Sequence, residues 1–218
     1  MAETFPVVRR ALESVVSLFA PDVCAGCDAR IGILRVFCPA CAGTLVRPEE
    51  TRENELAAFS YGGALVAAIT SLKYGGRVDR ARPLSHLLLG AVAPLRPVPP
   101  AVVVPVPLHR TRLALRGYNH AALLAAPVAR ALGARFAPTA LLRLRDTPAQ
   151  ATLRRSERLE NVEGAFVARP GGRPVAGERV LLVDDVKTTG ATLAACALAL
   201  REAGAAEVAT LVLAIAGD

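Results

Sequence analysis

The segment VLLVDDVKTTGAT, from Val180 to Thr192, joins four apolar residues to two adjacent aspartates and then to a loop rich in threonine and glycine. The apolar run predicts a buried strand of a parallel sheet. Asp184 and Asp185 then fall at its carboxyl edge, where such sheets bind ligands. The residues after Lys187 turn into the start of a helix, where unpaired N–H groups and the helix dipole attract an anion. The segment therefore predicts an α/β fold with an anionic ligand at this edge.

The residue types of the loop indicate which anion. Gly190 lets the backbone approach a ligand closely, and the hydroxyls of Thr188, Thr189 and Thr192 can donate to a phosphate. Carboxylates beside a phosphate cradle suit a ligand with a phosphate and neighbouring hydroxyls, of which a ribose 5-phosphate is the simplest. The alternative is a strand followed by an ordinary capped helix. That alternative accounts for one acid and one threonine, but not for the whole segment.

Strand and helix patterns alternate along the rest of the chain, which predicts a parallel sheet flanked by helices. The strands are expected at residues 56–61, 101–107, 140–144, 164–168, 179–184 and 207–214. The helices are expected at residues 7–19, 64–72, 83–93, 119–132 and 192–203. Residues 146–161 are polar without clear periodicity and are expected to form a long loop with some helix.

The composition limits the class of protein. The chain has 218 residues, 53% hydrophobic and 21% charged, which is typical of a globular protein. No apolar run approaches 18 residues, so no membrane span is expected. Charged residues interrupt the N-terminal apolar stretch, which argues against a secretory signal and for a cytoplasmic protein. The net charge of +7 suits anionic partners, but it is spread along the chain without a compact basic block.

Four cysteines near the N-terminus form two pairs with metal-ligand spacing, Cys24-x2-Cys27 and Cys38-x2-Cys41. Two such pairs can hold one tetrahedral zinc ion, and four thiolates leave no open position for catalysis. A redox pair and a disulfide are the alternatives, and the second needs an oxidising compartment. We therefore expect a structural zinc module with an N-terminal helix over residues 1–50, and an α/β domain over residues 51–218. Cys196 is expected to be an ordinary core residue.

A basic cluster follows the central strand, at the turn PLHR. The guanidinium groups of Arg110, Arg112 and Arg116 suit a diphosphate, although a single arginine is more often a solvated surface charge. His109 either contacts the same anion or caps the turn. These residues are candidates for a second anion site beside the first.

The segment 180–192 resembles the phosphoribosyl-pyrophosphate (PRPP) motif of type I phosphoribosyltransferases. The resemblance implies that Asp184 and Asp185 hold the ribose hydroxyls during phosphoribosyl transfer, with Mg²⁺ bridging the ribose and the diphosphate. It also implies a flexible closing loop containing Thr147, Gln150, Arg158 and Asn161. The resemblance further assigns the 5-phosphate to the loop formed by Thr188, Thr189, Gly190, Ala191 and Thr192.

From about residue 5 to residue 215 the chain resembles the ComF family, which is associated with natural competence and DNA uptake. The matching motifs are SLKYGG, which contains Lys73, VPVPLHRTRLALRGYNHA, DTPAQATLRRSERLENVEGAF and the two cysteine pairs. Lys73 is a further candidate for contact with the diphosphate. His120 departs from the family pattern, which more often has glutamine there. The resemblance implies PRPP as ligand and leaves the acceptor open. The alternative is a non-catalytic adaptor of DNA uptake that binds PRPP, a nucleotide or single-stranded DNA, beside a helicase partner.

Overall fold

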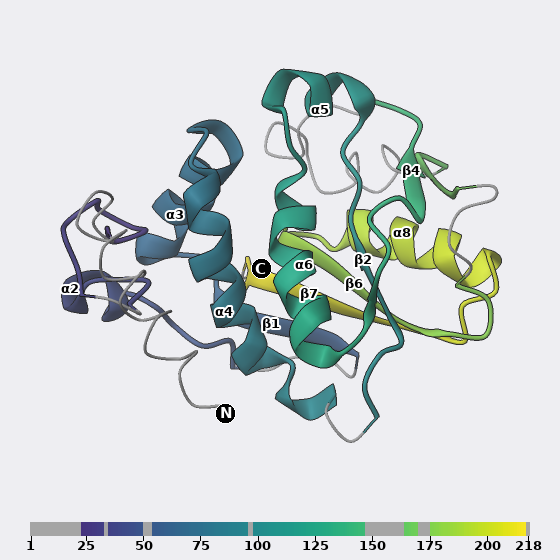
Figure 1. Cartoon of the computed structure of the whole chain (residues 1–218), viewed down its shortest axis with the longest axis horizontal. Helices are drawn as coiled ribbons and strands as arrows, with labels where there is room; N and C mark the ends of the chain where they lie inside the picture. Colours follow the sequence, from purple (N-terminus) through teal and green to yellow (C-terminus); the bar gives the residue numbers. More distant parts are fainter. Residues whose placement is uncertain are drawn as a thin grey trace, which may run out of the picture.

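The computed structural model describes residues 23–32, 35–49, 54–95, 98–146, 164–169 and 175–216. These residues form a five-stranded sheet in the order β1-β7-β6-β2-β3, in which every neighbouring pair is parallel (Figure 1). The strands are β1 (Glu55–Ser60), β2 (Val102–Pro105), β3 (Arg135–Phe136), β6 (Arg179–Lys187) and β7 (Glu207–Ile215). The predicted parallel α/β fold is confirmed.

Helices cover both faces of this sheet. One face carries α3 (Gly63–Tyr74), α4 (Ala81–Ala91) and α6 (His120–Leu132), whose buried side chains share a core with Val103 and Leu181. The other face carries α8 (Ala191–Glu202) and a separate antiparallel ribbon of β4 (Leu141–Arg143) and β5 (Phe166–Ala168). Both apolar faces of the sheet are therefore buried, as its β-branched central strands predicted.

The remaining described elements are short. They are α2 (Pro39–Ala42), α5 (Arg110–Arg116) and the 3-10 helices η1 (Val78–Arg80) and η2 (Ala93–Leu95). Helix α2 lies at one side of the molecule next to α3 (Figure 1).

The sheet has a topological switch point between two adjacent strands, β2 and the central strand β6. The chain leaves β2 through α6 to reach β3 on one side, whereas it leaves β6 through α8 to reach β7 on the other. Because the two connections diverge, the carboxyl ends of β2 and β6 form the topological switch point at which parallel sheets bind ligands.

The structure differs from the sequence prediction at several boundaries. Strand β6 does not end at Asp184 but continues to Lys187, because β7 extends far enough to pair Lys187 with Ile215. Helix α3 continues to Tyr74, two residues beyond its predicted end, and so includes Lys73. The expected strands 140–144 and 164–168 pair with each other in the ribbon rather than joining the main sheet. The N-terminal helix predicted at 7–19 lies outside the described residues.

Helix α5 was not predicted, because the segment after β2 was interpreted only as an anion-binding turn. Its first turn is capped by His109, whose Nδ1 accepts a hydrogen bond from the backbone of Thr111 at 3.4 Å. Its end is fixed by Gly117, which has a φ of 80°. A glycine in this left-handed conformation is a common helix stop, so the sequence did contain a signal for this helix.

Within the described ranges, no helix combines the length and apolar character needed to cross a membrane.

Candidate functional site

The two adjacent carboxylates lie near the carboxyl end of β6, between the two helical layers. Successive side chains of a strand point to opposite faces, so Asp185 faces the layer of α3 and α6, where it is 2% exposed. The Asp184 carboxylate is partly exposed and accepts a hydrogen bond from the Asp185 backbone N–H at 2.9 Å. Asp185 Oδ1 accepts one from the Val186 backbone N–H at 2.8 Å.

Lys73, on the last turn of α3, faces this pair. Its Nζ lies 2.6 Å from Asp185 Oδ2, with 23% of the lysine side chain exposed. Burial acts to lower the pKa of Lys73, but the charges of Asp185 and Asp184 outweigh it and raise that pKa. Lys73 was expected among the diphosphate residues, whereas the structure places its ammonium on a carboxylate of β6.

His120, the first residue of α6, is the residue at this site that the sequence did not assign to it. It is 5% exposed, and its Nε2 lies 3.5 Å from Asp185 Oδ2 and 4.0 Å from Asp184 Oδ1. Asn119 caps α6 by accepting the backbone N–H of Ala121. This cap places His120 at the carboxyl edge of the sheet, so the asparagine was the available signal.

The surroundings separate the acidities of the two aspartates. Burial, followed by the charge of Asp185, raises the pKa of Asp184 to about 7. Burial also acts to raise the pKa of Asp185, but the charge of the Lys73 ammonium is the largest opposing effect, and the pKa of Asp185 lies well below its ordinary value. At neutral pH Asp185 is therefore an anion, whereas Asp184 can exchange a proton.

The loop after β6 turns directly into α8 through a glycine in the left-handed conformation. Gly190 adopts a φ of 80° as the N-cap of α8, and Thr189 Oγ1 accepts the Ala191 backbone N–H at 3.4 Å. Thr188 to Thr192 thus lead directly into the first turn of a 12-residue helix. The Lys187 side chain lies close to Gly190 of this loop, and its Nζ forms an ion pair with Glu55 of β1.

The predicted basic cluster after β2 is not a single group in the structure. Arg112 pairs with Asp146, with 2.9 Å between Nε and Oδ1, whereas Arg116 contacts Nδ1 of His120 at 2.7 Å. Arg110 is exposed, and Arg158 lies outside the described residues, as do Thr147, Gln150 and Asn161. Arg112 and Arg116 occupy different surroundings because α5 winds this segment, which was expected to be a turn.

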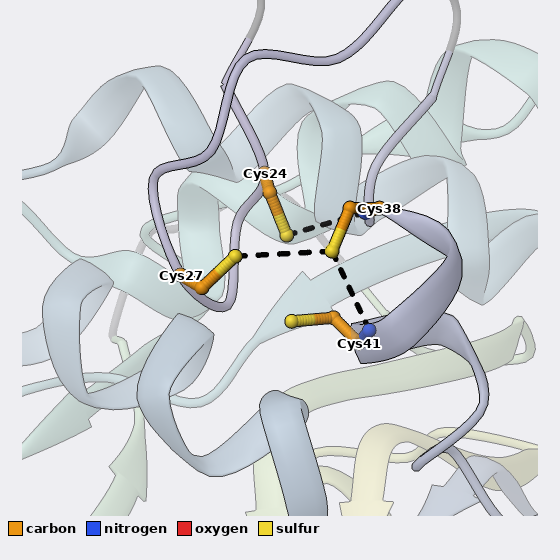
Figure 2. Close-up of side chains that lie close together, drawn as sticks. All are labelled: Cys24, Cys27, Cys38 and Cys41. Carbon is orange, nitrogen blue, oxygen red and sulfur yellow. Dashed lines mark hydrogen bonds between the residues drawn. The ribbon is translucent and has the colours of Figure 1, made fainter.

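The four cysteines come together beside α3, as their spacing predicted (Figure 2). Their Sγ atoms all lie within 4.8 Å of one another, and those of Cys27 and Cys38 are 3.8 Å apart. A zinc ion with Zn–S bonds of about 2.3 Å in a tetrahedron requires sulfur atoms about 3.8 Å apart. The cluster therefore fits a tetrahedral ion and could bind zinc.

Backbone N–H groups and burial change the pKa values of the cysteines in this cluster. Burial acts to raise the pKa of Cys24, but backbone N–H groups, first that of Cys38, lower it to about 6. The Cys38 N–H donates to Cys24 Sγ at 3.2 Å. Burial, together with the neighbouring sulfurs, raises the pKa of Cys41 to about 12. Such a site releases protons when it binds a metal, since the ligands must be thiolates.

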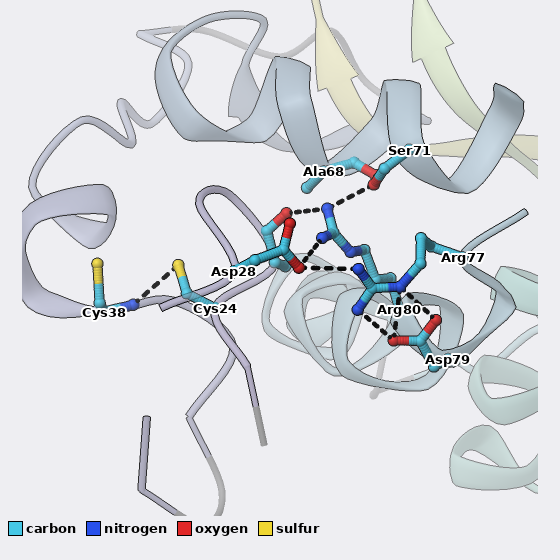
Figure 3. Close-up of polar contacts among 9 residues, drawn as sticks. Cys24, Asp28, Cys38, Ala68, Ser71, Arg77, Asp79 and Arg80 are labelled. Carbon is cyan, nitrogen blue, oxygen red and sulfur yellow. Dashed lines mark hydrogen bonds and ion pairs between the residues drawn. The ribbon is translucent and has the colours of Figure 1, made fainter. Parts of the chain in front are cut away.

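Arg80 connects the cysteine cluster to the helical layer. This arginine is 5% exposed and donates to the Ala25 carbonyl, to Ser71 of α3 and, at 2.6 Å, to Asp28 (Figure 3). Arg77 reaches the same Asp28 oxygen at 2.8 Å from a more exposed position. The turn that carries Cys24 and Cys27 is therefore joined to the end of α3, close to Lys73.

The second half of this fold matches the Phosphoribosyl transferase domain over residues 119–218, which include β6, its carboxylates and the loop into α8. The class defined by fold and site is thus that of phosphoribosyltransferase-like proteins, with an added four-cysteine cluster. Within this class, the chain belongs to the ComF family. It is 31% identical over 200 residues to the DNA utilization protein YhgH of Escherichia coli, a match that covers 85% of this chain and 87% of that protein.

Two other relatives, from Salmonella typhi and Haemophilus influenzae, give the same assignment. The chain is 33% identical to YhgH of Salmonella typhi, covering 93% of this chain and 86% of that protein. It is 29% identical to Competence protein F of Haemophilus influenzae, a match that covers 85% of this chain and 87% of that protein. Among solved structures, the allosteric regulatory enzyme of purine biosynthesis matches at 26% identity with a TM-score of 0.43. That match covers 66% of this chain but only 29% of the enzyme.

Proposed function

We propose that this protein binds PRPP with Mg²⁺ at the carboxyl ends of β2 and β6 and transfers the phosphoribosyl group to an acceptor. The observation that carries the proposal is the sequence of groups along β6: two carboxylates, then a glycine-containing loop, then the start of a helix. This order offers acceptors to ribose hydroxyls and donors to a phosphate within one continuous segment. The membership of the ComF family supports a role in natural competence and DNA uptake.

In this proposal each group has a separate task. Asp184 and Asp185 orient the ribose and stabilise the positive charge that develops on its ring as the bond to diphosphate breaks. The loop formed by Thr188, Thr189, Gly190, Ala191 and Thr192 binds the 5-phosphate. A magnesium ion bound with PRPP would supply positive charge beside the departing diphosphate. Arg110, which is exposed at the first position of α5, would contact that diphosphate in this proposal.

The cysteine cluster has a structural task in this proposal. Cys24, Cys27, Cys38 and Cys41 would hold one zinc ion with no open position, so the ion would stabilise a module over residues 1–50 next to the domain over 51–218. Four free cysteines that lie together fit a reducing compartment, which supports a cytoplasmic location.

Calorimetry with PRPP and Mg²⁺ tests the donor site. We expect binding to the wild-type protein and its loss in Asp184→Asn/Asp185→Asn. Gly190→Ala should also weaken binding, because its Cβ would come within 3.0 Å of the Lys187 side chain in a backbone with φ of 80°. Gly177→Ala is the matched control, since Gly177 precedes β6 at its other end and has a φ of 73° with nothing within 4 Å of the added Cβ. Equal losses in the two variants, or no binding to the wild type, would refute the donor site.

A second function is favoured by the contact between Lys73 and Asp185. Because one carboxylate is already neutralised by the protein's own ammonium, the site suits a ligand that is held without turnover. The protein would then be a non-catalytic adaptor of DNA uptake that binds PRPP or a nucleotide, with single-stranded DNA or a helicase as partner. Pyrophosphate release with a panel of bases distinguishes the two, since the adaptor binds PRPP but releases none.

A further inference from the structure

His120 lies between a cation on α5 and two carboxylates on β6. On one side, Arg116 at the end of α5 places a guanidinium nitrogen 2.7 Å from His120 Nδ1. On the other side, Nε2 faces Asp185 Oδ2 at 3.5 Å and Asp184 Oδ1 at 4.0 Å. The imidazole is thus in position to connect α5 with the carboxylates of β6.

Elementary hydrogen-bond chemistry determines where the ring carries its proton. A guanidinium has N–H donors and no acceptor, so Nδ1 must present a lone pair to Arg116. The proton of the neutral ring is then on Nε2, which faces the two carboxylates and would otherwise direct a lone pair at anionic oxygens. A doubly protonated ring would set an N–H group against the guanidinium, so the contact with Arg116 opposes that form.

We infer that His120 is a positioning residue of the donor site, which acts as a neutral Nε2–H tautomer that accepts from Arg116 and directs its N–H group to Asp184 and Asp185. Through His120, α5 holds the orientation of the carboxylates. Arg116 therefore acts on the site indirectly, through its contact with His120, and does not bind the ligand. Lys73 supplies the positive charge at Asp185, and His120 supplies a neutral dipole. The effect on ligand binding rests on the proposed function; the tautomer does not.

The same geometry argues against a metal ion held by His120, Asp184 and Asp185, although their ligand atoms lie within 4.8 Å of one another. A metal would need the Nε2 lone pair, which this tautomer lacks. It would also lie next to the Lys73 ammonium, which is already 2.6 Å from Asp185 Oδ2. The carboxylates therefore face one protein cation and one N–H group.

Nitrogen-15 NMR of the histidine rings tests the tautomer without any ligand. For His120, which is assigned by its absence in His120→Gln, we expect Nδ1 in the pyridine-like range and Nε2 in the pyrrole-like range at pH 7.5. Arg116→Met should release Nδ1 and produce a mixture of tautomers. A protonated Nδ1 in the wild type, or a tautomer unchanged in Arg116→Met, would overturn the inference.

Calorimetry with PRPP and Mg²⁺ then tests the positioning role. His120→Gln keeps an acceptor for Arg116 and a donor for the carboxylates, so its affinity should stay within about threefold of wild type. His120→Leu removes both and should weaken binding by about tenfold or more. His86→Leu, at an exposed position on α4, is the control for the change of residue type.

The outcomes separate this inference from the proposed function. A leucine variant that binds as well as wild type, or a glutamine variant as weak as the leucine variant, contradicts the positioning role. If the leucine variant fails to fold, Arg116→Met serves instead and should bind more weakly than wild type. Absence of PRPP binding in every protein, wild type included, refutes the proposed function, and the NMR result still decides the state of His120.

Discussion

The ammonium of Lys73 lies 2.6 Å from the Asp185 carboxylate and joins the end of α3 to the carboxyl end of β6. Both groups are largely shielded from water, with 23% and 3% of their side chains exposed. A buried charge without its partner is costly, whereas a pair in which both members are removed together need not be. The stability of this edge of the sheet should therefore depend on the two residues jointly.

Replacing Lys73 alone should destabilise the protein strongly. Lys73→Met leaves Asp185 as an unpaired buried anion, and removing one partner of a buried pair costs about 3–5 kcal/mol. Lys73→Met/Asp185→Asn should recover much of that loss in urea unfolding. Lys187→Met is the matched control. Its partner Glu55 is 35% exposed, so a loss below about 1 kcal/mol is expected. Similar losses in the two lysine variants would contradict this account.

Asp184 should make stability depend on pH in a definite direction. Because burial raises its pKa to about 7 from an ordinary value of 3.8, the folded state holds a proton between these values that the unfolded state has released. The contribution of Asp184 is therefore present at low pH and is lost as the pH rises toward 7. Urea unfolding at pH 5 and pH 8 should show a larger fall in wild type than in Asp184→Asn, and parallel behaviour would disprove the assignment.

The parts of the site that could be predicted from the sequence are those contained in one short segment. Asp184, Asp185 and the loop to Thr192 follow each other along the chain, so their order along a strand, a turn and a helix start was enough to bring them together. The cysteine cluster could be predicted for the same reason. Within each pair a spacing of two residues brings two sulfurs together, and contact between the two pairs then completes the cluster of four.

The parts that could not be predicted depend on packing between distant elements. Lys73 reaches Asp185 only because α3 runs two residues further than its apolar pattern indicated. His120 reaches the same pair because α6 packs on β6 and begins at its carboxyl end. The sequence also suggested one basic group after β2, but the winding of α5 separates Arg112 from Arg116, and no local pattern shows that separation.

The connection between the cysteine cluster and the sheet domain should depend on Arg80 more than on its neighbour Arg77. Arg80 is buried and joins Ala25 and Asp28 to Ser71. Of these three partners Arg77 contacts only Asp28, and its side chain is more exposed. Arg80→Leu should increase the rate of proteolysis near residues 23–49 and weaken metal retention, and Arg77→Leu should do so much less. Equal sensitivity of the two variants would mean that the connection lies elsewhere.

Gly26, between the first two cysteines, offers a test of the cluster that removes none of the four cysteines. A Cβ at this position would lie 2.7 Å from the Ala64 Cβ and 3.0 Å from Cys41 Sγ, so Gly26→Ala must move either α3 or a metal ligand. We expect this variant to hold zinc much less tightly than wild type in a competition with a chelator, and to unfold at a lower temperature.

Gly43→Ala is the control for Gly26→Ala, because its added Cβ would meet only backbone atoms at 3.5 Å and 3.6 Å. That variant should keep about one equivalent of zinc per chain by metal analysis, since the four-thiolate site is left intact. Zinc retention in Gly26→Ala equal to that in Gly43→Ala would show that the cluster tolerates a shift of Cys41. A wild-type protein purified with less than about half an equivalent would argue against the closed zinc site altogether.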